Sequence, residues 1–448
     1  PVFTDELGPL APLVGLWEGQ SGFTGIPVAP GGAGYVERQN VFPLGAFHNR
    51  LINETTHAVG YECWINDTAG AGFHYETGQW WWVPSKGLIA KVTTVPRGQA
   101  FVAGGLVGDG ETWELSTNDT SVPGVGMLDM NGDTEVPTVG FYTTVTLNST
   151  HYCYHDVTQL MIPTSGGSQL FPHAAIHCLK RVEESRRLTP APRPLAAPRT
   201  RRLGAVSVDD QFSGLGPLAD MIGKWQGTGV TVTPDGKSVP YVERQELVSL
   251  GGAQNQLIAQ RTYGLKYDYW MDTLDGESLY HEQGQWWWLP SKKVVARAVV
   301  GPRGHLVVAG SRWVGGDIEI SANHSDVAGL GVLDFNKDSG VAIEDMWSTV
   351  SYSPDSGLLC HNTTAALNTG TIVHHTAGSC LQRSSPDYCP VSSFFASAAS
   401  STAAAPTGPS TAAGPPGPTC DLIPEKYRIT YQRVDDSLEV SVVLRTDG

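Results

Sequence analysis

Short stretches of alternating apolar and polar residues follow one another from Trp17 onward, separated about every ten residues by Gly, Pro, Asn and Asp. Strict alternation places successive side chains on opposite faces, as in a half-buried β-strand. The pattern predicts an all-β domain, an antiparallel up-and-down β-barrel of about ten strands, closed so that no edge is exposed. In the first part of the chain the expected strands are 35–42, 47–55, 72–83, 87–95, 100–107, 112–117, 138–147, 151–161 and 174–182.

Before the first strand, residues 8–15 favour a short helix of one or two turns that ends at Gly15. Glycine is a common residue just past a helix end. We therefore expect a short N-terminal helix beside the barrel.

The whole pattern occurs twice. The segment HYETGQWWWVPSK at 74–86 returns as YHEQGQWWWLPSK at 280–292, and YVERQ at 35–39 returns at 241–245. Each copy is far longer than the unit of a solenoid, so a complete domain is duplicated. We expect the first barrel at 1–184 and the second at 211–386.

The Trp triplet inside this repeat has aromatic side chains on both faces of one strand. Alternation sends Trp80 and Trp82 to one face and Trp81 to the other. Such a strand either lines a large apolar pocket or carries core packing on one face and an outer packing surface on the other. The second interpretation allows the two barrels to pack on each other.

Three further segments differ in composition from the barrels. Residues 185–210 are a basic Pro/Arg linker, and 387–420 are a low-complexity Ala/Ser/Pro stretch expected to be disordered. Residues 421–448 alternate like a short β-hairpin, too small to be stable alone. The linker is interpreted as a solvated tether, with binding to an acidic or anionic surface as the alternative.

Net charge and hydropathy exclude some classes of partner. The formal charge of −15 argues against nucleic acid, because phosphate binding needs a basic face. We find no run of 18 apolar residues that predicts a transmembrane segment. The first residues lack the basic and apolar regions of a signal peptide.

Cysteine usage and glycosylation sequons bear on the compartment. Seven Cys, an odd number, do not predict a disulfide framework and favour a reducing compartment. The Asn-x-Ser/Thr sequons at Asn53, Asn66, Asn118, Asn148, Asn323 and Asn362 are interpreted as chance matches. We expect a cytoplasmic protein, with secretion as the alternative.

Several short motifs occur in the same order in both copies. The string GKWQGTG at 223–229 has the form GxWxGxG, and 15–21 repeats it with Ser in the last place. With the strand motif HYETG at 74–78 and the YVE at 35–37 and 241–243, the chain resembles the nitrobindin family, heme-binding β-barrels related in shape to fatty-acid-binding proteins, over 8–183 and 216–383. The resemblance implies heme b as cofactor and makes these motif residues candidate cofactor contacts: Trp17, Gly19, Trp225, Gly227 and Gly229.

The resemblance also implies one axial His on the last strand of the barrel, a few residues before a basic pair. His173 and His375 occupy equivalent places in the two copies and are the first candidates for the heme-iron ligand. His177 is the second choice, because its counterpart in the other copy is Ser379. His374 replaces His375 if the strand is shifted by one residue.

Two classes of function follow from this resemblance. A ferric heme with one open face suits nitric oxide or peroxynitrite, and the family implies isomerisation of peroxynitrite to nitrate without an obligatory protein acid or base. The alternative is a carrier of a fatty acid or another apolar small molecule without iron chemistry. A duplicated interaction scaffold with filled cores is a third interpretation. The chain has no phosphate-binding loop, nucleophile elbow or metalloprotease helix, which argues against ordinary kinase or hydrolase chemistry.

Two other clusters have the residue types of metal sites. His151, Cys153 and His155 alternate on one strand, as zinc ligands can, but the second copy does not repeat them. Residues 334–345 carry acidic groups at several calcium-loop positions, although a turn rich in Asn and Asp explains them as well.

Overall fold

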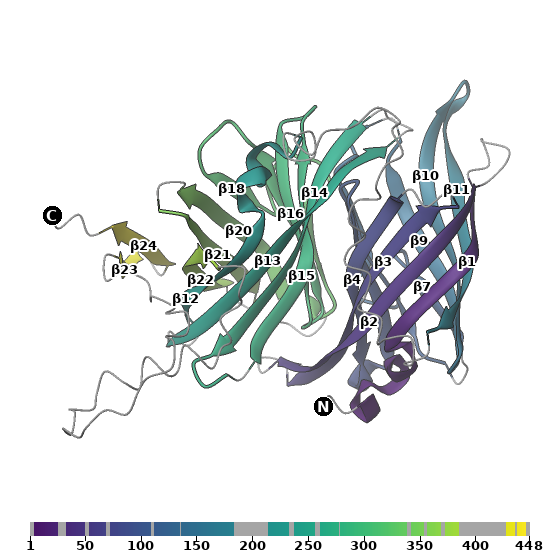
Figure 1. Cartoon of the computed structure of the whole chain (residues 1–448), viewed down its shortest axis with the longest axis horizontal. Helices are drawn as coiled ribbons and strands as arrows, with labels where there is room; N and C mark the ends of the chain where they lie inside the picture. Colours follow the sequence, from purple (N-terminus) through teal and green to yellow (C-terminus); the bar gives the residue numbers. More distant parts are fainter. Residues whose placement is uncertain are drawn as a thin grey trace, which may run out of the picture.

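The computed structural model describes residues 4–182 and 214–384, except for short stretches at 26–32, 50–52, 69–71, 109–111, 135, 233–236, 256–259, 277, 338–341, 354–355 and 369–371, and it also describes the strands at 427–434 and 437–444. Figure 1 shows two β-barrels side by side. The linker expected at 185–210 and the low-complexity stretch expected at 387–420 lie outside the described residues.

The first barrel is one antiparallel sheet that closes on itself. Its strands follow in the order β5-β4-β3-β2-β1-β11-β10-β9-β7-β6, and β5 also pairs with β6, while the short β8 pairs with β6 beside the ring. The strands are β1 (Gly15–Gly25), β2 (Ala33–Asn49), β3 (Glu54–Asp67), β4 (Gly72–Val83), β5 (Leu88–Val95), β6 (Gln99–Leu106), β7 (Thr112–Ser116), β8 (Gly126–Asp129), β9 (Thr138–Leu147), β10 (His151–Thr164) and β11 (Gly167–Arg181).

The second barrel repeats this topology, with β16 closing on β17 and β19 beside the ring. Its strands are β12 (Gly223–Val232), β13 (Ser238–Asn255), β14 (Gln260–Thr273), β15 (Ser278–Leu289), β16 (Val294–Gly301), β17 (His305–Arg312), β18 (Ile318–Ser321), β19 (Gly331–Asp334), β20 (Ala342–Ser353), β21 (Leu358–Asn368) and β22 (Ile372–Arg383). The predicted fold, two tandem antiparallel up-and-down barrels, is confirmed. At the end of the chain, β23 (Tyr427–Val434) and β24 (Ser437–Leu444) pair as the expected hairpin.

Two strands of the first barrel differ from those predicted by the sequence pattern. We expected separate strands at 35–42 and 47–55, but β2 runs through Asn49 with a register shift between Pro43 and Gly45. The strand β3 (Glu54–Asp67) then occupies residues that the pattern left mostly unassigned. A bulge of this kind lets one long strand bend without ending.

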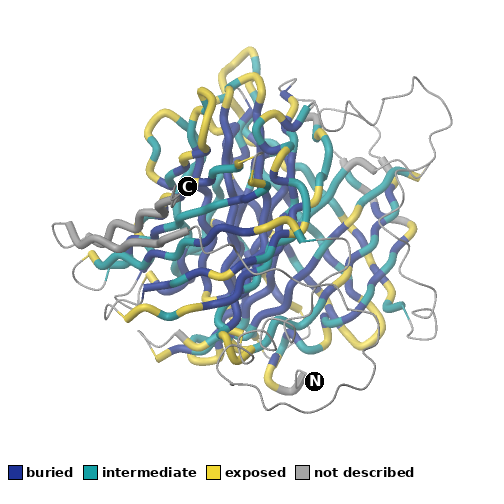
Figure 2. Tube along the Cα trace, turned by 60° about the vertical axis from the view of Figure 1, so that its left-hand side comes forward, coloured by how far each residue is buried: buried dark blue, intermediate teal, exposed yellow. Residues whose placement is uncertain are grey.

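Short 3₁₀ helices close one end of each barrel: η1 (Thr4–Leu13) and η4 (Gly216–Met221). The indole of Trp17 donates to the carbonyl of Leu13 at 2.7 Å, and Trp225 donates to Met221 at 2.8 Å. Both Trp side chains are buried in the barrel cores, which run as a dark-blue band through the molecule in Figure 2. The predicted N-terminal helix is therefore a cap tied to the first strand.

The two barrels pack against each other along β4 and β15, which lie side by side in Figure 1. Trp81 and Trp287, the middle residues of the two triplets, are fully buried in one apolar cluster shared by both barrels. Trp80 belongs instead to the interior of its own barrel. The alternation predicted for the triplet is confirmed, and its outer face is the contact between the barrels.

Contacts across this interface come in reciprocal pairs, as they do across a twofold axis. Gln79 donates to the carbonyl of Val300 at 3.2 Å, and the equivalent Gln285 donates to the carbonyl of Thr94 at 2.9 Å. The oxygen of each glutamine amide accepts the indole N–H of a buried tryptophan, Trp81 for Gln79 and Trp287 for Gln285. Each amide therefore holds a tryptophan in its own barrel and the backbone of the other.

A second reciprocal pair links the turns that follow β8 and β19. Lys86 donates to the carbonyl of Phe335 at 3.1 Å, and Lys292 donates to that of Met130 at 2.9 Å. These turns are held by Asp129 and Asp334, whose carboxylates accept backbone N–H groups two and nine residues further on. In the acidic stretch at 334–345, Asp334 thus serves as an acceptor for the backbone N–H groups of Asn336 and Ile343.

The structure overturns the expectation that the cysteines form no disulfides. Cys153 on β10 is bonded to Cys178 on β11, and Cys360 on β21 is bonded to Cys380 on β22. Each pair joins directly opposed residues of neighbouring strands, and the two occupy the same place in the two barrels. Disulfides of this kind persist in oxidising rather than reducing compartments. With Cys153 bonded to sulfur, it is also unavailable to the zinc site considered for His151 and His155.

Candidate functional site

His173 and His375 point into their barrels from equivalent positions. His173 lies opposite Thr158 on β10, and its Nε2 is 2.8 Å from the hydroxyl of Thr24 on β1. In the second barrel Nε2 of His375 is 3.1 Å from the hydroxyl of Thr231 on β12. Both copies thus hold an inward imidazole against a threonine of the first strand.

Both imidazoles are held in the neutral form. Burial, followed by the positive charge of Arg97, lowers the pKa of His173 to about 4. Burial and the charge of Arg303 likewise lower the pKa of His375. A neutral ring keeps a nitrogen lone pair, which a metal ion requires.

The threonine and arginine partners of these histidines were not among the residues predicted from the sequence. Arg97 and Arg303 lie in the Pro-Arg-Gly turn that both copies carry at 96–98 and 302–304. That repeated turn was the signal that could have identified them. Thr24 and Thr231 carry no local signal, because only the pairing of the first and last strands brings them to the histidines.

The other two histidine candidates lie elsewhere. His374 packs its ring against Trp347, with the ring centroids 5.3 Å apart, and that Trp is 37% exposed. His374 is therefore directed to the outside of the barrel. His177 faces the interior but is engaged by a carboxylate: its Nδ1 lies 2.8 Å from Oε2 of Glu37.

Glu37, the acidic residue of the YVERQ motif, is fully buried and surrounded by donors. Its partners are His177, the hydroxyl of Tyr154, the amide of Gln39 at 2.6 Å and the thiol of Cys63 at 3.4 Å. A buried carboxylate is tolerated when its oxygens are satisfied in this way. Glu37 of the motif thus accepts hydrogen bonds inside the barrel and has a structural role.

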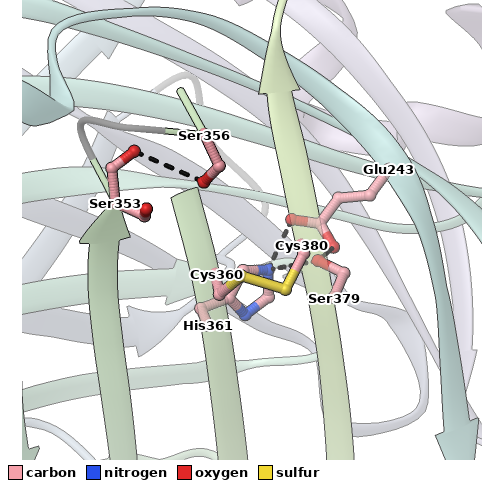
Figure 3. The surroundings of a disulfide bond; sticks show 7 residues. All are labelled: Glu243, Ser353, Ser356, Cys360, His361, Ser379 and Cys380. Atoms are coloured by element: carbon pink, nitrogen blue, oxygen red, sulfur yellow. Dashed lines mark hydrogen bonds and ion pairs between the residues drawn. A yellow bond between two sulfur atoms is a disulfide. The ribbon is translucent and has the colours of Figure 1, made fainter. Parts of the chain in front are cut away.

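The second barrel satisfies the equivalent Glu243 with a histidine from a different strand. His361 on β21 lies 2.6 Å from Glu243, and Ser379, the counterpart of His177, donates to the same carboxylate at 2.6 Å (Figure 3). Burial alone would raise the pKa of Glu243, but the charge of His361 and these hydrogen bonds outweigh it, so the pKa is lowered.

This Ser, His and Glu group does not have the arrangement of a hydrolase triad. Nε2 of His361 contacts both Glu243 and, at 2.9 Å, Ser379, while its Nδ1 has no partner. In a triad one nitrogen of the imidazole contacts the carboxylate, which orients the ring, and the other nitrogen contacts the serine and takes its proton. Here Ser379 is buried and already donates to the carboxylate.

A buried cation enclosed by aromatic rings lies in the middle of each barrel. Nζ of Lys91 is 3.2 Å from Asp156 and 5.4 to 6.0 Å from the ring centroids of four aromatic residues. Burial alone would lower the pKa of Lys91, but Asp156 and Glu76 raise it above its usual range. In the second barrel Arg297 pairs with Glu282 and lies 4.7 Å from the ring centroid of Tyr267.

A polar chain leads from this cation toward His173. Nη2 of Arg97 donates to Nδ1 of His74 at 2.8 Å, and Nε2 of His74 contacts Glu76 at 2.9 Å. The second barrel replaces His74 by Tyr280, whose hydroxyl lies 3.0 Å from His305. The first barrel thus has charged side chains around Lys91 and a half-buried imidazole at His173. The contacts between these two places differ in the second barrel.

The two tryptophans of the GxWxGxG strings lie far along the first strand from the residues that contact His173 and His375. Trp17 pairs with Arg181 and Thr24 with Ala175, seven residues further along β1, or roughly 23 Å at the rise of a strand. Gly19, Gly227 and Gly229 instead leave room for neighbouring groups, since a Cβ there would collide with His177, Leu381 and Tyr241 respectively. The structure thus gives these five residues packing roles, and Gly229, two residues from Thr231 on β12, is the one nearest along its strand to a residue that contacts His173 or His375.

The residues around His173 and His375 are of types that would suit a bound heme. Each site supplies a neutral imidazole that faces the interior, a hydroxyl that contacts its Nε2, and an arginine whose charge reaches it. A guanidinium is a suitable partner for a heme carboxylate.

Comparisons with known proteins agree with this fold. Residues 6–131 and 214–383, together more than half of the chain, match the family described as THAP4-like, heme-binding beta-barrel domain. The second match includes His375, whereas the first ends before β9. A search of curated proteins found no match.

Two solved structures are similar to the chain at low identity. Rv2717c from M. tuberculosis is 18% identical, with 38% of this chain and 98% of that chain covered and a TM-score of 0.31. A DUF3598 protein of unknown function from Nostoc punctiforme is 11% identical, with 84% and 98% covered and a TM-score of 0.17. None of the helices in the described parts of this chain has the length and apolar character needed to span a bilayer.

Proposed function

Because the chain belongs to the THAP4-like, heme-binding β-barrel family, we propose that it holds heme b at His173 and His375. The observation that carries this proposal is the repeated pair of neutral, inward imidazoles, each against a threonine hydroxyl. Equivalent groups in two diverged copies are better explained by a shared ligand than by packing alone, since other interior pairs have changed.

The bound heme would supply an iron centre at which nitric oxide binds or peroxynitrite is isomerised to nitrate. The chain's own contribution is to present an uncharged nitrogen donor and to fix its ring. Thr24 and Thr231 orient the imidazoles, and Arg97 and Arg303 supply positive charge beside them. That charge favours an anion, either a heme carboxylate or an anionic nitrogen oxide.

The alternative of a fatty-acid carrier receives less support from the interior. A long apolar chain entering a barrel would have to lie against Lys91 or Arg297, each paired with a buried carboxylate. Breaking such an ion pair and placing its charges against hydrocarbon costs roughly several kcal/mol for each ion.

Titration with hemin tests the proposal. The wild-type chain should give a Soret band that saturates at two hemes per chain, and His173→Ala and His375→Ala should each remove one. The double variant should bind none, while His374→Ala, whose ring lies outside the barrel, serves as the matched control. Unchanged stoichiometry in the double variant would rule out both ligands, and its urea unfolding curve would show that the fold is retained.

A further inference from the structure

A crevice of about 360 Å³ lies where the two barrels meet, away from both histidine sites. Its walls come from β2 and β3 of the first barrel and from β14 and β15 of the second. The lining residues are Phe42, Pro43, Leu44, Phe47, Glu62, Asp268, Trp270, Ser278 and His281. Its size falls in the lower part of the range of small-molecule sites, which often form between domains.

His281 is the polar group in this wall that lacks a partner. Its side chain is 6% exposed, and Nε2 has no hydrogen-bond partner. The ring stacks on Trp270, with centroids 5.3 Å apart and an interplanar angle of 13°. Leaving such a nitrogen unsatisfied costs about 1–3 kcal/mol, so a group that binds it is favoured.

The charges beside His281 favour a ligand that donates a hydrogen bond to Nε2 over one that accepts a hydrogen bond from it. Glu62 and Asp268 face each other across the interface with Lys266 between them, 2.8 Å from Asp268. Burial lowers the pKa of His281 to about 4, so at neutral pH the ring carries no charge. Arg244 lies beside Trp270 and is paired with Asp272, so three carboxylates and two cations leave this end of the crevice negative.

The residues that line the crevice differ from those at the equivalent place on the other side of the interface. The reciprocal contacts of the two barrels create a second, equivalent place, where Phe42 and Phe47 are replaced by Val248 and Ala253. There His281 is replaced by Tyr75. Aromatic walls and a free imidazole nitrogen thus occur together only where Phe42 meets Trp270.

We propose that this crevice binds a small aromatic amine, with its ring against Phe42 and Phe47 and its N–H directed to Nε2 of His281. The aromatic walls recognise a planar ring through stacked or edge contacts. The carboxylates of Glu62 and Asp268 select a cation over an anion. The site is separate from the heme proposal and does not depend on it.

Isothermal titration of the full chain with tryptamine tests the proposal, with indole-3-acetate as the probe of the same ring and opposite charge. Tryptamine should bind at one site per chain, and indole-3-acetate should bind at least tenfold more weakly. His281→Leu and Phe42→Val should each weaken tryptamine at least tenfold. Tyr75→Phe, the change at the equivalent place on the other side, should leave binding unchanged.

Three outcomes would overturn the proposal. These are the absence of saturable tryptamine binding, equal binding of both probes, and binding that His281→Leu and Phe42→Val do not alter. Phe42→Val installs the residue that the second barrel has at this position, so it should fold, and a thermal melt of each variant checks this. Removal of heme binding by His173→Ala with His375→Ala should leave tryptamine binding intact.

Discussion

Nδ1 of His177 lies 2.8 Å from the carboxylate of Glu37, a residue 140 positions away in the chain. In the second barrel the equivalent carboxylate meets His361, which comes from the neighbouring strand, while Ser379 stands in place of His177. The buried carboxylate thus contacts an imidazole in both copies, but the histidine comes from the last strand in the first barrel and from the strand before it in the second. This exchange indicates that His177 serves Glu37 rather than iron.

Replacing His177 should therefore cost stability and leave heme binding intact. His177→Ala removes a principal donor to a buried carboxylate, and we expect a loss of about 3–5 kcal/mol in the free energy of unfolding. Adding Tyr154→His to His177→Ser installs the arrangement of the second barrel and should recover part of that loss. Urea unfolding measures both effects, and a hemin stoichiometry lowered by His177→Ala would contradict the assignment.

Heme loading of the first barrel should persist in weak acid. The pKa of His173 is lowered from 6.5 to about 4, so the neutral ring proposed to bind iron remains down to that pH and is lost as the pH falls through it. The measurement is the Soret band of the His375→Ala variant between pH 4 and 7. Arg97→Gln removes a charge that lowers this pKa and should move the loss to higher pH. A midpoint near 6.5 in the parent would refute the prediction.

The two interface glutamines should contribute equally to stability. Gln79→Leu leaves the carbonyl of Val300 without its donor, and Gln285→Leu does the same to Thr94. Each change should cost about 1–3 kcal/mol, the penalty of an unsatisfied buried group. Chemical denaturation measures the cost, and Lys180→Gln on the exposed face should change it by less than about 0.5 kcal/mol. A cost confined to one barrel would show that the interface is not reciprocal.

The disulfides should be detectable without any functional assay. Peptide mapping without reduction should recover Cys153 linked to Cys178 and Cys360 linked to Cys380. Replacing Cys153 and Cys178 together by Ser should lower stability by about 3 kcal/mol, since the bridge closes a loop of 25 residues. Finding all four as free thiols in protein kept under oxidising conditions would contradict the pairing.

Much of the fold was predictable because it depends on local alternation. The period of two placed Trp80 and Trp81 on opposite faces, and the structure confirms that one lies in the barrel and the other between barrels. The same alternation directs His173 inward. The boundary between β2 and β3 was not predictable, since Glu54 and Thr56 are polar side chains buried in β3, where the pattern expects apolar ones.

The interior of the site depended on contacts between distant residues. No local pattern pairs Glu37 with His177 or Lys91 with Asp156, which belong to different strands. The disulfides were missed for a simpler reason. Cys153 and Cys360 are equivalent but lie 207 positions apart, whereas Cys178 and Cys380 lie 202 apart, so a single offset did not align both pairs.

The reciprocal contact along β4 and β15 has the form of a symmetric dimer made within one chain. Where two identical subunits associate, every substitution near the axis is made twice, and a residue that improves one side must be tolerated on the other. Covalent fusion removes this constraint, because each half can change alone. The protein can therefore keep the reciprocal contacts of Gln79 and Gln285 while Phe42 and Val248 differ. The two sides of the interface are then related in position but unlike in surface.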